Sequence, residues 1–209
     1  MRTLVLLLGL ALMAPCARAA DLQLVLHSPK GQPIRDAVAA YYPQGGAGAG
    51  PIRFDWPYRE AQQNLQFDPF ILVVPVGATV AFPNRDTVRH QVYSFSPAHP
   101  FQLKLYSREE SRTVRFDRVG VIALGCNIHD SMVAFIKVVD TPFAAKTDAM
   151  GVVVLHGLPA GAGMLKIWHP YLKATGNELA SSLTMPPGGV VQRTEIADVR
   201  SPPIRRNSY

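Results

Sequence analysis

Residues 119–139 read VGVIALGCNIHDSMVAFIKVV. The apolar runs at the two ends of this stretch are rich in β-branched residues, which is typical of neighbouring strands joined by a tight loop. The loop between them holds one thiol, one imidazole and one thioether at a regular spacing, on Cys126, His129 and Met132. The stretch therefore predicts a β fold, and its loop is the first candidate for a functional site.

Short β-type runs continue on both sides of this stretch. Residues 21–27 (DLQLVLH) alternate in polarity, residues 70–74 (FILVV) are continuously apolar, and residues 78–82 (ATVAF) and 90–95 (HQVYSF) are rich in β-branched and aromatic side chains. Turn sequences such as PVGAT and FPNRD separate them. This spacing predicts an all-β protein of the antiparallel sandwich or barrel type. We expect one short helical turn, over residues 57–65 (PYREAQQNL).

The composition is that of a globular protein, with 48% hydrophobic and 17% charged residues in a chain of 209. That length suits one large domain or two small ones. The net charge is +6, but the basic residues are scattered, so no basic stripe for nucleic acid is expected. We find no nucleophile-elbow, Walker A or zinc-protease motif, and we expect a protein that is not an enzyme.

Residues 1–19 have the features of a cleavable export signal. A basic Arg2 precedes the apolar run 4–13 (LVLLLGLALM), and the small residues Ala17 and Ala19 follow at the spacing of a cleavage site. A membrane-spanning helix needs about 20 apolar residues, so this run is too short to span, and no second long apolar run follows. We expect a periplasmic protein without a membrane span. A lipid anchor at Cys16 is the alternative.

Loss of the signal would leave Cys126 as the only thiol, in an oxidising compartment. Such a thiol is buried and inert, links two molecules, or binds a metal. The neighbouring His129 and Met132 favour a metal, and a methionine ligand favours copper over zinc. His90 is the best candidate for a second imidazole, because turns at one end of a sandwich can meet. The predicted ligands are His90, Cys126, His129 and Met132, the set of a mononuclear blue-copper centre.

Residues 66–140 resemble a cupredoxin. The segment FDPFILVVPVGATVAFPNRDTVRHQVYSF is similar to the plastocyanin pattern that leads to the first ligand histidine, and C-x-x-H-x-x-M has the ligand spacing of the amicyanin type. The segments VYSFSP and GCNIHDSM resemble in particular those of the plastocyanin-like proteins assigned to methylamine utilisation. The resemblance implies a Greek-key sandwich and the same four copper ligands.

The resemblance also implies supporting residues next to the ligands. Asn84 lies in the loop that leads to the first histidine, and Gln91 stands where cupredoxins usually have an asparagine that supports the thiolate loop. Asn127 follows the cysteine, where a proline is common. These departures bear on the reduction potential and on the bond to Met132.

The flanking segments 22–42 and 147–170 resemble the two halves of a carboxypeptidase regulatory-like domain. This resemblance implies a smaller, transthyretin-like β-sandwich made of residues 20–45 and 141–172. The alternative is that the first strands belong to the cupredoxin domain. The end of the chain, residues 198–209, is expected to be disordered.

Three functions are compatible with this sequence. The first is an exported, monomeric blue-copper protein that carries single electrons to or from a redox protein, such as a c-type cytochrome or a dehydrogenase. The second is a copper chaperone or storage module. The third is a metal-free β-sandwich for adhesion or for carbohydrate binding.

Overall fold

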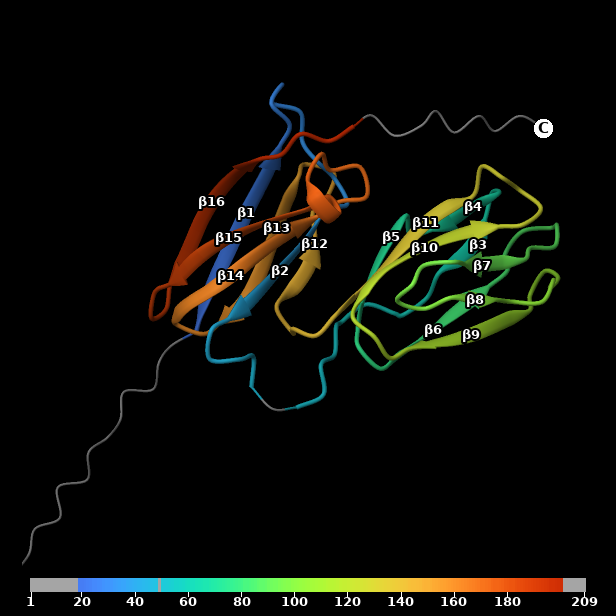
Figure 1. The fold of residues 1–209 in the computed structure, drawn as a ribbon, viewed down its shortest axis with the longest axis horizontal. Coiled ribbons are helices and arrows are strands. Elements are labelled where there is room, and N and C mark those ends of the chain that lie inside the picture. The colour runs from blue at the N-terminus through green and yellow to red at the C-terminus, as the bar shows by residue number, and fades with distance from the viewer. Residues whose placement is uncertain (1–18, 49, 201–209) are drawn as a thin grey trace, which may run out of the picture.

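The computed structural model describes residues 19–48 and 50–200, which form two β-sandwiches side by side along the long axis of the molecule (Figure 1). Within these ranges the one helical element is the short 3-10 turn η1, Thr175–Asn177. The prediction of an all-β protein is therefore confirmed. The described residues contain no helix that is long and apolar enough to cross a membrane.

The central sandwich takes its strands from the middle of the chain. One sheet has five strands in the order β5-β11-β10-β7-β8, and the other side is made by β6 with β9 and by β3 with β4. The strands are β3 Ala61–Gln63, β4 Gln66–Asp68, β5 Ile71–Pro75, β6 Ala78–Pro83, β7 Val92–Ser94, β8 Phe101–Gln102, β9 Ser111–Phe116, β10 Gly120–Cys126 and β11 Val133–Val139.

The prediction of a helical turn over residues 57–65 is wrong. These residues form an extended segment and β3, followed by a turn in which Asn64 and Leu65 both have a φ of 55°. The backbone of Glu60 donates a hydrogen bond of 2.8 Å to Ala81 in β6. This pairing with a distant strand outweighs the weak local preference of a short segment for helix.

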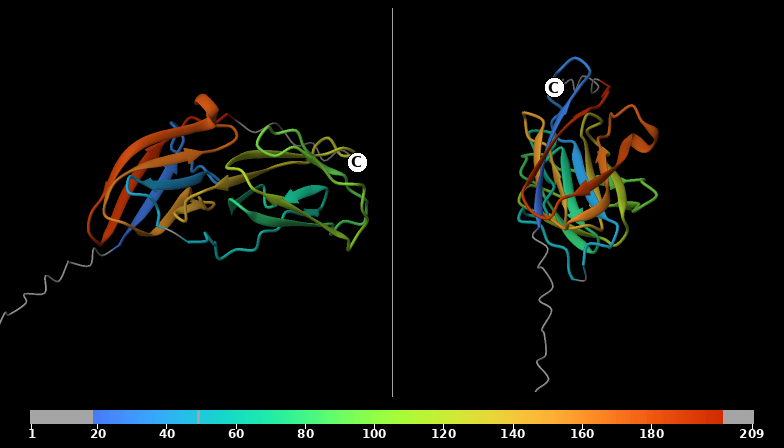
Figure 2. Two further views of the ribbon diagram at one scale, coloured as in Figure 1. Left: turned by 60° about the horizontal axis from the view of Figure 1, so that its bottom comes forward. Right: turned by 90° about the vertical axis from the view of Figure 1, so that its left-hand side faces the viewer.

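The flanking sandwich combines strands from both ends of the described chain (Figure 2). Its sheets have the orders β13-β1-β16 and β12-β2-β14-β15. The strands are β1 Ala20–His27, β2 Val38–Pro43, β12 Ala144–Lys146, β13 Val152–Leu158, β14 Gly161–Trp168, β15 Glu178–Met185 and β16 Val190–Ile196. The two segments that flank the cupredoxin-like region thus pair with one another, β1 with β13 and β2 with β12 and β14.

Two strands of this sandwich lie in a region that the sequence analysis left unassigned. β15 pairs with β14, and β16 pairs in parallel with β1. Residues 198–200, where we expected disorder, are also held: Lys173 donates a backbone hydrogen bond to Asp198, and Arg200 donates one to Tyr171, each at 2.8 Å. The export signal predicted for residues 1–19 lies outside the described residues except for its last residue, and residues 201–209 lie outside them as well.

A third apolar cluster joins the two sandwiches. In β5, Leu72 and Val74 face the core of the central sandwich, whereas Ile71 and Val73 face the cluster between the sandwiches. A strand that is buried on both faces needs no polar positions, which explains the continuous apolar run FILVV. Trp168 of β14 fills the same cluster and meets the Phe135 ring edge-on, at 5.9 Å between centroids.

The burial of His169, which follows Trp168, makes the stability of the fold depend on pH. Burial lowers the pKa of His169 from 6.5 to about 4, although the charge of Asp36 opposes the shift. Between these two values the unfolded chain binds a proton that the folded protein does not, so stability is lost as the pH falls from 6.5 to 4.

His169→Asn should therefore make the unfolding free energy less dependent on pH. The amide oxygen of asparagine can still accept the backbone hydrogen bond from Tyr171, which is 3.3 Å long in the wild type. Urea titrations at pH 7 and pH 4 should show a difference that is smaller in the variant by on the order of 3 kcal/mol. An unchanged difference would contradict the low pKa.

Candidate metal centre

Strand pairing brings the first histidine to the cysteine. β10 pairs with β7 so that Cys126 lies opposite Val92, and the backbone N–H of Asn127 donates to the carbonyl of Gln91 at 3.0 Å. His90 comes two residues before the start of β7 and therefore lies beside Cys126 at the same end of the central sandwich.

The loop after β10 brings back the second histidine. The N–H of Met132 donates to the carbonyl of His129 at 3.0 Å, which closes a turn. β11 then starts opposite the end of β10, with Val133 paired to Gly125. Because the loop is short and both of its ends are paired, His129 stays close to Cys126.

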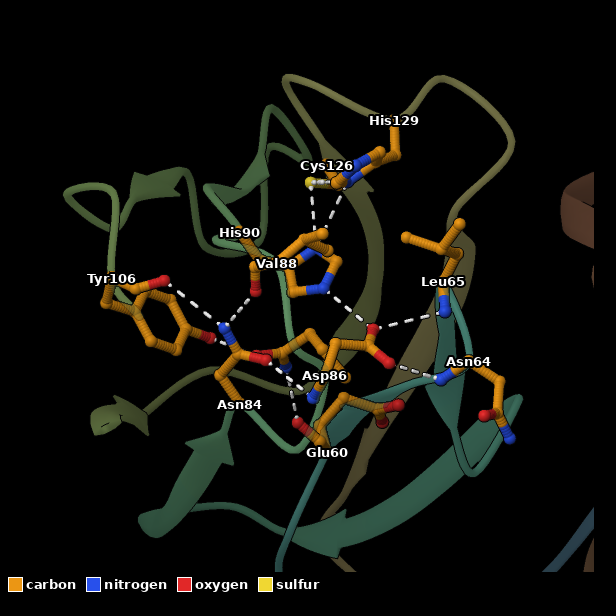
Figure 3. A network of polar contacts seen from close by, with 11 residues as sticks. Glu60, Asn64, Leu65, Asn84, Asp86, Val88, His90, Tyr106, Cys126 and His129 are labelled. Atoms are coloured by element: carbon orange, nitrogen blue, oxygen red, sulfur yellow. Dashed lines mark hydrogen bonds and ion pairs between the residues drawn. The ribbon is translucent and has the colours of Figure 1, made fainter. Parts of the chain in front are cut away.

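Three ligand atoms converge on one point (Figure 3). The Sγ atom of Cys126 lies 3.6 Å from Nδ1 of His90 and 3.6 Å from Nδ1 of His129, and the two Nδ1 atoms are 3.2 Å apart. The centre of a triangle with these sides is about 2.0 Å from each corner, close to an ordinary bond from a metal ion to imidazole. A single ion can therefore contact all three atoms. No other group of three His, Cys, Asp or Glu residues in the described chain converges in this way.

The centre is shielded from solvent on one side. His90 is 0% exposed and Cys126 is 3% exposed, whereas His129 is half-buried. Burial lowers the pKa of His90, and the nearby His129 adds to this effect, while the hydrogen bond that the ring donates to Asp86 opposes it. The buried imidazole is therefore neutral at pH 7, as a metal ligand must be.

Met132 is 1% exposed and belongs to the same apolar cluster as Cys126. The structure thus places the thioether residue in the core that also holds Cys126, immediately before β11. Its role as the axial ligand stays a prediction.

The three predicted supporting residues hold the ligand-bearing segments together. The amide of Asn84 donates to the carbonyls of Val88 and Tyr106, at 2.8 and 3.2 Å, and so fixes the loop that leads to His90. The side chain of Asn127 donates to Gln91 at 3.0 Å. Gln91 and Asn127, which follow the predicted ligands His90 and Cys126, are thus hydrogen-bonded to each other.

The sequence analysis missed a polar network beneath the centre (Figure 3). Nε2 of His90 lies 2.8 Å from Oδ2 of Asp86. Tyr106 exchanges backbone hydrogen bonds with His90 in both directions, at 3.1 Å, and its hydroxyl donates to Gln62. Burial, and secondarily the nearby Cys126, raise the pKa of Tyr106 far above its ordinary value. Asp86 could have been found from its place four residues before a candidate ligand, but only the fold brings Tyr106 and Gln62 here.

Glu60 lies in the same region, but its side chain is not part of the hydrogen-bond network. Its side chain is fully buried, and neither carboxylate oxygen has a hydrogen-bond partner among the residues of the described chain. Burial raises the pKa of Glu60 well above 4.5, and the charge of Asp68 raises it further, against a smaller effect of Lys146.

Glu60→Gln should stabilise the protein at alkaline pH. Because the pKa is raised in the folded state, the wild type loses stability as the pH rises above 4.5, and glutamine removes this loss. At pH 8 the variant should be more stable by at least about 1 kcal/mol, and the difference should shrink toward pH 4. Thermal unfolding across this range measures it. A variant that is less stable than the wild type at pH 8 would mean that the buried carboxylate has a partner.

Comparison with known proteins gives partial matches. The sequence matches no protein-family model and no curated protein. Among solved structures, a reduced mutant of amicyanin is similar over 42% of this chain and 86% of its own, with 20% identity and a TM-score of 0.38. A purple cupredoxin from Nitrosopumilus maritimus covers 36% of this chain and 84% of its own, with 25% identity and a TM-score of 0.34.

A copper-containing nitrite reductase from Thermus scotoductus is also similar, over 56% of this chain and 28% of its own, with 24% identity and a TM-score of 0.39. With similarities this partial, the interpretation of the site depends on the chain's own residues. Fold and site together define an all-β protein with a Cys–His–His centre at one end of a sandwich.

Proposed function

We propose that this chain is a cupredoxin-type protein that binds one copper ion and carries single electrons. The observation that supports this most directly is the convergence of the Cys126 sulfur and the two Nδ1 atoms on a point about 2.0 Å from each. Met132 would complete the set as the axial ligand.

The chemistry of the donors favours copper over zinc. Structural zinc sites use four good nitrogen, sulfur or oxygen donors in a tetrahedron. Here the fourth candidate donor is the thioether of the buried Met132, a soft ligand that suits copper. A thiolate with two imidazoles and a weak axial methionine is the donor set of electron-transfer copper sites.

The surrounding residues suit the transfer of electrons. Bound copper would supply a one-electron couple. The protein holds Cys126 on a strand and His90 in a buried, hydrogen-bonded position, so neither ligand is free to rearrange when the charge of the site changes. The half-buried His129 connects the centre with the surface, where a redox partner can approach.

The cellular setting is part of the proposal. The export signal over residues 1–19 would bring the protein to the periplasm, where a c-type cytochrome or a dehydrogenase could be its partner. The likeness of VYSFSP and GCNIHDSM to proteins assigned to methylamine utilisation supports that pathway as the first in which to test for a redox partner. A copper chaperone is the alternative function.

Cys126→Ser should abolish the intense visible absorption of the copper-loaded protein, because this absorption requires the thiolate. Met132→Leu is the matched control, since it removes only the proposed axial ligand. We expect that variant to keep its colour and to change its reduction potential. A colourless wild type that binds copper would contradict the blue-copper assignment.

An electron carrier and a copper chaperone differ in what happens when the bound copper is reduced. A carrier keeps its metal in both oxidation states, whereas a chaperone gives up Cu(I) to a partner. We expect reversible voltammetry with the copper content unchanged over repeated cycles in the presence of a modest Cu(I) chelator. Loss of copper to the chelator in each reduced phase would favour delivery.

A further inference from the structure

We propose that Asp86 is a positioning residue of the metal centre, whose carboxylate fixes the ring of His90 and strengthens it as a donor. This proposal rests on the proposed function in one respect, that the ion is copper. The contact itself is independent of the metal.

The contact determines which nitrogen of His90 carries the hydrogen. Nε2 is 2.8 Å from Oδ2 of Asp86, while Nδ1 of the same ring faces Cys126 and His129. A carboxylate can only accept hydrogen bonds, so the hydrogen is on Nε2. The lone pair of Nδ1 is then directed at the point where the three donors converge.

Asp86 is held in place without the help of His90. Its Oδ1 accepts the backbone N–H of Asn64 at 2.5 Å, and its Oδ2 accepts that of Leu65 at 3.1 Å. Its own N–H donates to Oδ1 of Asn84 at 2.9 Å. Because of these bonds, and because its side chain is only 11% exposed, the carboxylate is fixed in position behind the ligand ring.

A charged acceptor does more than orient the ring. A carboxylate on the far nitrogen increases the basicity of a ligating imidazole, and removal of such a partner typically weakens metal binding by about 10- to 100-fold. A stronger donor favours the more highly charged metal ion, so Asp86 should stabilise Cu(II) relative to Cu(I). His129 has no comparable acceptor among the described residues. The two imidazoles are therefore inequivalent, one fixed by the protein and one near solvent.

The first test uses the full-length protein without metal. In ¹⁵N NMR spectra of the histidine rings, wild-type His90 should be a single tautomer with hydrogen on Nε2. Asp86→Ala should give a mixture of tautomers. If His90 in Asp86→Ala stays a single Nε2–H tautomer, the positioning role is overturned. Because no copper is present, this result does not depend on the proposed function.

The second test uses the copper-loaded protein and the variant Asp86→Asn, which removes the charge. The amide oxygen in the place of Oδ2 can still accept the hydrogen bonds from His90 and Leu65, and the NH2 group in the place of Oδ1 loses only the bond from Asn64. We expect Cu(II) binding to weaken about tenfold more than Cu(I) binding, which raises the reduction potential by about 59 mV. An unchanged potential would overturn the effect on donor strength.

Asp148→Asn is the matched control. Its carboxylate accepts the backbone N–H groups of Met150 and Val152, at 2.8 and 2.9 Å, in a turn of the flanking sandwich, and it contacts no histidine. This variant makes the same change from carboxylate to amide in a turn, where the amide oxygen can still accept both N–H groups, and it should keep the wild-type potential. A shift as large as that of Asp86→Asn would show that the shift comes from general destabilisation, and it would overturn the proposal.

Discussion

The antiparallel pairing of β10 with β7 is the constraint on which the metal centre depends. It sets Cys126 opposite Val92 and so brings together two ligands that lie far apart in the chain. A slip of one residue would turn every side chain of a strand to the other face. The register is fixed by burial, because Val92, Ile122 and Leu124 all face the central core.

The flanking sandwich supports this arrangement from the other end. β5 is an edge strand of the sheet that carries the ligands, and such edges are exposed to unwanted pairing or loss of packing. Here the outer face of β5 is covered by Val38, Ala40 and Trp168 of the flanking sandwich. β11, which follows the ligand loop, pairs with β5 and is stabilised by the same contacts.

Polar groups are buried beneath the centre at a cost that hydrogen bonds offset. His90, Asn84 and Gln62 are fully buried or nearly so, and each has partners in the network. Satisfied networks of this kind make a core rigid and specific, whereas an unsatisfied group destabilises it. Glu60 is the exception, and its raised pKa expresses the cost of burying its charge.

The sequence by itself determined the all-β class and the proximity of Cys126 to His129, because alternation and loop length are local properties that a short segment enforces. It did not determine the extended conformation of residues 57–65 or the strands β15 and β16. Those depend on pairing between distant segments, whose free energy exceeds local preference and leaves no periodic signal. The tertiary structure alone decided which histidine nitrogen faces the sulfur, since register and side-chain packing orient the ring.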